Sequence, residues 1–133
     1  MQIDKGILPI VDMMECTGWI ETRGSCQGHS RGIHRLPYVL FDCRQNEIRR
    51  LATILDNADK ELEEIGAPFH IDCQLVFNTD IGSNTVDAYL GWVTFEIRPL
   101  VVKGYKMLKV DKEIFAYTIA NEFIDYLKQA LPE

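Results

Sequence analysis

The residues best suited to chemistry lie in one acid-free segment, residues 22–35, of sequence TRGSCQGHSRGIHR. Within it, a Ser-Cys-Gln-Gly-His turn places a hydroxyl, a thiol and an imidazole in five consecutive positions, residues 25–29. Gly24 and Gly28 flank the polar side chains, so the backbone can adopt left-handed angles and aim consecutive amides at one point. Such a turn predicts a binding site for a phosphate or a carboxylate.

Arginines surround the same turn, although the chain has a net charge of −6. Six of the seven arginines precede residue 51, whereas residues 51–133 hold seven Lys/Arg against fourteen Asp/Glu. Guanidinium groups bind carboxylates and phosphates through paired N–H donors, so this local cluster predicts a pocket for a small anion rather than a polyanion surface. The expected ligand contacts are Arg23, Ser25, Cys26, Gly28, His29, Arg31, Arg35 and Tyr38, the last at the mouth of the site.

Cys26 and His29 leave two chemical alternatives open. Their C-x-x-H spacing can ligate zinc, but a closed site needs four ligands, and folding would have to recruit the others from His34, Cys43 and Cys73. No second paired motif exists, so we expect no metal site. Alternatively, nearby cations favour the Cys26 thiolate as a nucleophile, and His29 can act as a general acid or base. These two residues are the catalytic candidates, and whether the protein is an enzyme stays open.

A second group of polar residues alternates along two later segments. His70, Asp72 and Glu96 form an acid–base or metal cluster only if strand register brings them together. The ordinary interpretation of such alternation is the solvated face of a sheet. Trp92 and Arg98 on that face are typical of a contact surface, which makes a protein-interaction module or a homodimer the third functional alternative.

Seven elements must position these residues. Hydrophobic periodicity predicts helices over about residues 7–17, 44–65 and 111–131 and strands over residues 19–25, 36–43, 69–77 and 89–97. Asp42 is expected to cap the second helix, and Gly66 to end it. The last two strands are expected to form a hairpin. The α-β-β-α-β-β-α order predicts an α+β fold with helices packed on one face of a mainly antiparallel sheet.

Length and composition limit the class of protein. With 133 residues, of which 47 % are hydrophobic, residues 1–133 are expected to form one two-layer globular domain. The acidic balance argues against binding of duplex nucleic acid. No apolar run approaches the roughly 20 residues of a membrane span, and the first residues lack a signal-peptide pattern. We therefore expect a cytoplasmic protein without a membrane partner, and reduced cysteines.

The first 43 residues, with a helix followed by an aromatic-led strand into the turn, resemble the wybutosine-synthesising methyltransferase family. That family carries a Thr-Thr-Ser-Ser-Cys-x-Gly-Arg turn. The matching positions here are Thr22, Arg23, Gly24, Ser25, Cys26, Gln27, Gly28 and His29, with His29 in place of arginine. The resemblance implies a turn that helps to bind S-adenosylmethionine and a modified guanosine in tRNA.

Two leading functions follow from the sequence. The first is a domain that binds a small anionic or nucleotide-like ligand at the Ser-Cys-Gln-Gly-His turn. The alternative, which rests on the resemblance, is a transferase that uses S-adenosylmethionine.

Overall fold

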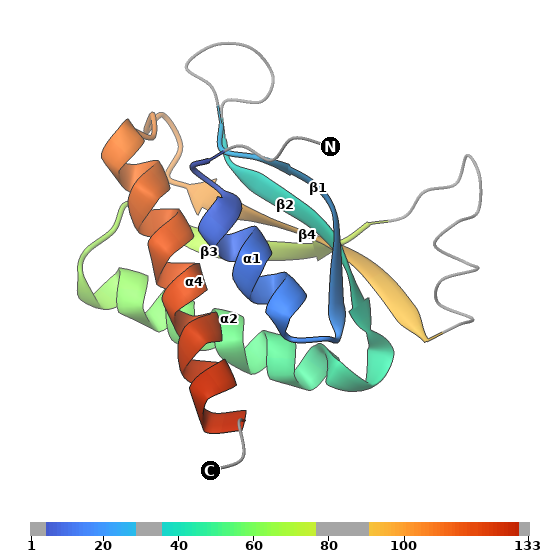
Figure 1. Cartoon of the computed structure of the whole chain (residues 1–133). Coiled ribbons are helices and arrows are strands. Elements are labelled where there is room, and N and C mark those ends of the chain that lie inside the picture. The colour runs from blue at the N-terminus through green and yellow to red at the C-terminus, as the bar shows by residue number, and fades with distance from the viewer. Residues whose placement is uncertain (1–4, 29–35, 77–90, 131–133) are drawn as a thin grey trace.

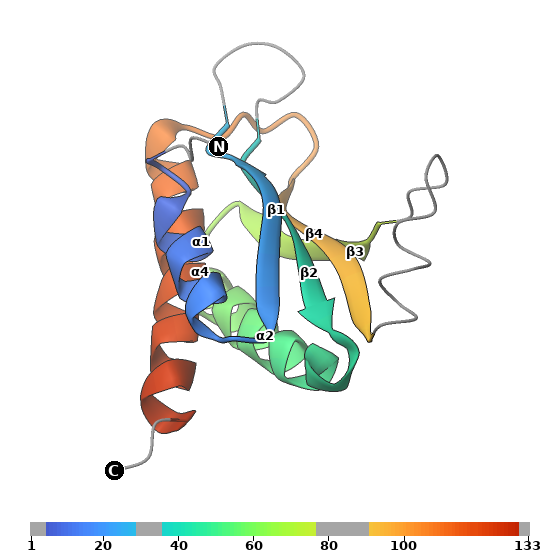
Figure 2. The ribbon, with the colours of Figure 1, turned by 45° about the vertical axis from the view of Figure 1, so that its right-hand side comes forward.

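The computed structural model describes residues 5–28, 36–76 and 91–130, which form a two-layer α+β unit (Figure 1). One antiparallel sheet has the strand order β1 (Ile20–Cys26), β2 (Tyr38–Arg44), β4 (Trp92–Val101) and β3 (Phe69–Leu75). The helices are α1 (Leu8–Cys16), α2 (Ile48–Glu64) and α4 (Lys109–Ala130). They pack on one side of the sheet (Figure 2), which confirms the predicted fold class and element order. Every helix in the described residues is too short or too polar to serve as a membrane span.

One hydrophobic core fills the space between the helices and the sheet. Alternate residues of β2 point into it, so Val39, Phe41 and Cys43 are fully buried. From the other layer, Phe115 of α4 meets Phe69 of β3 edge to face, with ring centroids 6.2 Å apart. Helix α4 contacts both α1 and α2, which explains why its apolar residues extend around more than one side.

The expected cap of the second helix is wrong. Asp42 lies within β2, where Thr94 donates a hydrogen bond of 2.6 Å from its hydroxyl to Asp42 Oδ1. Asp42 Oδ2 is 3.3 Å from Arg23 Nε, so this buried carboxylate is paired within the sheet. Helix α2 instead begins after a short 3-10 turn, η1 (Gln45–Glu47), and neither element has a side-chain cap.

Strand β4 extends past the predicted end at residue 97 and includes a proline, which is unusual in a central strand. Pro99 faces Ile71 of β3, whose backbone N–H points away from β4 to Asp59 Oδ1, at 2.8 Å. On the other side, pairing between β4 and β2 stops at Ile97 and Val39. A backbone N–H at position 99 would therefore have no neighbouring strand to donate to, which is why the sheet tolerates proline there. The β3–β4 pairing confirms the predicted hairpin partners, and residues 77–90 lie outside the described residues.

Both edges of the sheet carry a carboxylate from a helix. On β1, Glu15 of α1 accepts hydrogen bonds from the backbone N–H and the hydroxyl of Thr22. On β3, Asp59 of α2 accepts the backbone N–H of Ile71. Exposed edge amides can pair with another chain, so these carboxylates occupy one donor on each edge strand and place a charge beside it.

Two acidic side chains meet where α2 packs on α4. Glu122 of α4 shares a hydrogen bond with Glu61 of α2, and Asp125 lies nearby. Burial, followed by the hydrogen bond and the two carboxylates, raises the pKa of Glu122 to about 7, from an ordinary value of 4.5. The pair is therefore held together by a proton below neutral pH.

We expect the free energy of unfolding to fall as the pH rises from about 5 to 8, because the folded protein binds the Glu122 proton more tightly than the unfolded chain does. Water screens this partly exposed pair, so the loss should be about 1 kcal/mol. Glu122→Gln should remove that part of the pH dependence in denaturant titrations at pH 5, 6.5 and 8. Identical slopes for Glu122→Gln and wild type would contradict this assignment.

Candidate ligand-binding site

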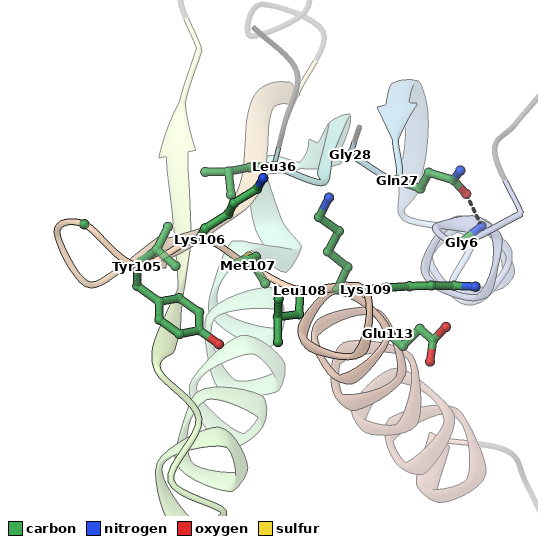
Figure 3. A pocket seen from close by; sticks show the side chains of 13 residues that line it. Gly6, Gln27, Gly28, Leu36, Tyr105, Lys106, Met107, Leu108, Lys109 and Glu113 are labelled. Carbon is green, nitrogen blue, oxygen red and sulfur yellow. Dashed lines mark hydrogen bonds between the residues drawn. The ribbon is translucent and has the colours of Figure 1, made fainter. Parts of the chain in front are cut away.

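A cavity of about 810 Å³ lies where β1 ends and α4 begins (Figure 3). Its wall comes from three parts of the chain: the segment before α1, the end of β1 together with Leu36 before β2, and the connection from β4 into the first turn of α4. This volume falls in the range of small-molecule sites. The sheet and α4 thus bring residues near position 28 beside residues near position 108.

The end of β1 forms one fixed wall of the cavity. The backbone N–H of Gly6 donates a hydrogen bond of 2.7 Å to Gln27 Oε1, drawn as a dashed line in Figure 3. A Cβ atom at position 6 would lie 2.7 Å from the same oxygen, so a larger residue there would displace the Gln27 side chain. Gly28 has a φ of +89°, as predicted for the turn, and its N–H points to the sulfur of Cys26 at 3.4 Å.

The opposite wall is basic. Lys106, Lys109 and Lys112 line it, and Glu113 is the one acidic residue among the described residues of the lining. In Figure 3 the side chain of Lys106 extends toward Leu36. The first turn of α4 adds the positive end of the helix dipole, which favours a negative group. This wall can hold an anion.

Sequence reasoning missed these lysines, although a signal for them exists. Lys103, Lys106, Lys109 and Lys112 repeat every three residues and make up four of the seven cations in residues 51–133. The rest of this half of the chain is acidic, so the run of four lysines is a local signal that could have indicated the candidate site.

Asp111 holds the basic wall in place. Its Oδ2 atom accepts a hydrogen bond of 2.6 Å from the Tyr105 hydroxyl and one of 2.8 Å from the backbone N–H of Leu108. Asp111 is buried, whereas Tyr105 and Leu108 both line the cavity. The hydrogen bond to Asp111 raises the pKa of Tyr105 above its ordinary value, so the phenol stays protonated and continues to donate.

The structure spreads the described members of the predicted site along β1 and β2. Gly28 lines the cavity, and Cys26 lies two residues before it, buried and opposite Tyr38. Ser25 pairs with Val39. The pocket-lining residues include neither Ser25, Cys26 nor Tyr38.

Arg23 occupies a different place. It is the extra residue of a β-bulge in β1 and pairs with Asp42, away from the cavity lining. His29, Arg31 and Arg35 lie outside the described residues.

Strand register separates the second predicted cluster. Arg98 Nε lies 3.5 Å from Asp72 Oδ2, and an Arg98 terminal nitrogen lies 3.9 Å from Glu96 Oε1. His70 instead lies beside Asp59, with Nδ1 and Oδ1 3.4 Å apart. The two acids are therefore bridged by a cation, as on an ordinary solvated face. On the same face Arg44 stacks over Trp92, 4.6 Å from its ring centroid, and the interaction-module alternative stays a prediction for this surface.

Two of the cysteines that zinc would recruit, Cys43 and Cys73, lie in surroundings that disfavour the thiolate. Burial raises the pKa of both Cys43 and Cys73 to about 12. In residues 5–28, 36–76 and 91–130, no three His, Cys, Asp or Glu side chains gather closely enough to hold a metal ion. Comparison of the chain with family models, with curated proteins and with solved structures finds no match.

Proposed function

We propose that this protein binds a small anionic or nucleotide-like ligand in the cavity between the end of β1 and the start of α4. The observation that carries the proposal is the meeting of Gly28, from the predicted anion-binding turn, with three lysines in one cavity. Lysine ammonium groups and a helix N-terminus both favour a phosphate or a carboxylate. The net negative charge of the rest of the chain would repel a polyanion but still allow a small anion to bind.

The predicted arginines fit this proposal through their position in the sequence. Gly28 and Leu36 both line the cavity, and the seven residues between them include His29, Arg31 and Arg35. We propose that these side chains supply further donors to the bound anion. Arg23 has a smaller role in the proposal, because Asp42 already pairs with it.

The first test is a thermal-shift panel of inorganic phosphate, nucleoside monophosphates, cyclic nucleotides, sugar phosphates, S-adenosylmethionine and its demethylated product. A ligand at about 100 times its Kd should stabilise the fold by roughly 2.7 kcal/mol. For a domain of this size the melting temperature should rise by about 10 °C. Weakening of the shift by added salt would indicate binding through exposed charges.

Lys109→Ala and Lys112→Ala should each lower the affinity for the ligand found in that panel by about tenfold or more, because a hydrogen bond to a charged group contributes about 1.5–3 kcal/mol. His29→Ala and Arg31→Ala should also weaken binding of that ligand, measured for all variants by calorimetric titration, without unfolding the protein. Lys128→Ala is the matched control, since it removes the same charge from the last turn of the same helix. Unchanged affinity in all four site variants would overturn the proposal.

A transferase that uses S-adenosylmethionine is the second proposal. The observation in its favour is that Gln27 and Gly28, two positions of the motif that carries the family resemblance, line the cavity. His29 would then serve as general acid or base, with Cys26 beside the turn. Stabilisation by S-adenosylmethionine and its demethylated product, but not by other anions, would favour this function. Absence of affinity for both would remove it.

A further inference from the structure

The cavity that carries the lysines also has an apolar wall. Leu36, Val101, Met107 and Leu108 line it together with the ring of Tyr105. Leu108 lies outside the core, in the stretch between Lys106 and Lys109, and 59 % of its surface is exposed. A leucine left open to water inside a cavity is unsatisfied apolar surface that a ligand can cover.

The apolar wall is already held in shape. The shared hydrogen bonds to Asp111 fix Tyr105 and Leu108, and Met107 between them is almost fully buried at 5 % exposure. A surface that is ordered before binding loses little conformational entropy when a ligand arrives. Contact with it can therefore add to affinity.

Charged residues flank apolar ones along this wall. Lys106 and Lys109 enclose Met107 and Leu108 in the sequence, and all four line the cavity (Figure 3). A compact anion at the ammonium groups would leave the neighbouring aliphatic surface wet. An anion joined directly to an apolar body would satisfy both surfaces at once, and the cavity volume is that of drug-sized ligands.

We infer that the ligand is an organic anion whose acidic group is attached to an apolar body, with the acid at Lys109 and the body against Leu108. This inference rests on the proposed function, because it assumes that the cavity binds an anion. The inference favours such organic anions over inorganic anions and sugar phosphates as ligands.

A series of alkyl phosphates tests the inference: methyl, butyl and hexyl phosphate, with inorganic phosphate as the reference. Affinity should rise about three- to fourfold for each methylene that becomes buried. Binding is measured by NMR titration, with the backbone amides of Gly28 and Leu108 as reporters. These amides should shift with every member of the series.

Two variants separate the contributions of the two surfaces. Leu108→Ala should flatten the alkyl series, so that hexyl phosphate gains little affinity over inorganic phosphate, whereas Lys109→Ala should weaken every member by a similar factor. Leu100→Ala is the matched control, because Leu100 is equally exposed at 59 % but does not line the cavity. Its series should match that of the wild type.

The failures are distinguishable. If inorganic phosphate binds at Gly28 and Leu108 but added methylenes bring no gain, the inference is overturned and the proposed function stands. If no member of the series, phosphate included, perturbs these amides, both are overturned.

Discussion

Phe115→Ala should lower the free energy of unfolding by about 3–5 kcal/mol, the largest effect that we predict for any single substitution. Phe115 is fully buried in α4, and its ring meets that of Phe69 at an angle of 65°. The contact joins the helix layer to the sheet, so truncation removes a large apolar side chain and leaves a cavity between the layers. Since small domains are stable by about 5–15 kcal/mol, much of the total stability would be lost.

Denaturant titrations would measure this loss. Phe115→Leu, which retains more apolar volume, keeps the comparison possible if the alanine variant does not fold. Tyr117→Ala is the control on the same helix, because Tyr117 is 57 % exposed and should lose less than about 1 kcal/mol. A loss at Phe115→Ala no larger than that at Tyr117→Ala would show that the layers do not depend on this contact.

The sequence was sufficient for the parts of the fold that depend on local periodicity. Helix α2 has a continuous apolar stripe, from which Leu51, Leu55, Ala58 and Leu62 are buried. The alternation along residues 69–73 likewise predicted which face of β3 points inward, whereas Leu75, predicted for the same face, is half exposed. In both cases one side of the element is buried by the rest of the molecule, and a repeat of 3.6 or 2 residues records which side.

Contacts between distant residues could not be predicted in the same way. Asp42 precedes a helix, and so it resembles a capping residue, but its hydrogen-bond partner Thr94 is 52 positions away. Similarly, Pro99 argues locally against a central strand. Its tolerance depends on where β2 begins and on the outward direction of the Ile71 N–H. Only strand order and register reveal these relations.

The candidate site likewise has one part that the local sequence predicts and one part that depends on contacts between distant residues. Gly28 lies in the segment where glycine and polar residues predict a turn locally, and its positive φ agrees with that prediction. The lysines of residues 106–112 lie far along the chain, and each one alone is typical of a solvated surface. They become part of the candidate site only because α4 begins beside the end of β1.

Asp111→Ala should affect both stability and binding, because one carboxylate holds two cavity residues. The substitution leaves the Leu108 N–H and the Tyr105 hydroxyl without their acceptor, and the start of α4 loses its stabilising acid. We expect the free energy of unfolding to fall by about 2–3 kcal/mol. Affinity for a ligand of the cavity should fall about tenfold, because the wall is no longer ordered in advance.

Conservative variants separate positioning from general loss of stability. Asp111→Asn keeps an acceptor of the same shape and should retain more stability than Asp111→Ala, while Tyr105→Phe removes only one of the two donors. Spectrophotometric titration adds a specific readout: since the hydrogen bond to Asp111 raises the pKa of Tyr105, Asp111→Ala should return that pKa toward its ordinary value. A lowered tyrosine pKa together with unchanged ligand affinity would show that Asp111 orders the wall without serving the site. A lowered tyrosine pKa together with a lowered ligand affinity would show that this buried carboxylate couples the folding of α4 to the shape of the cavity.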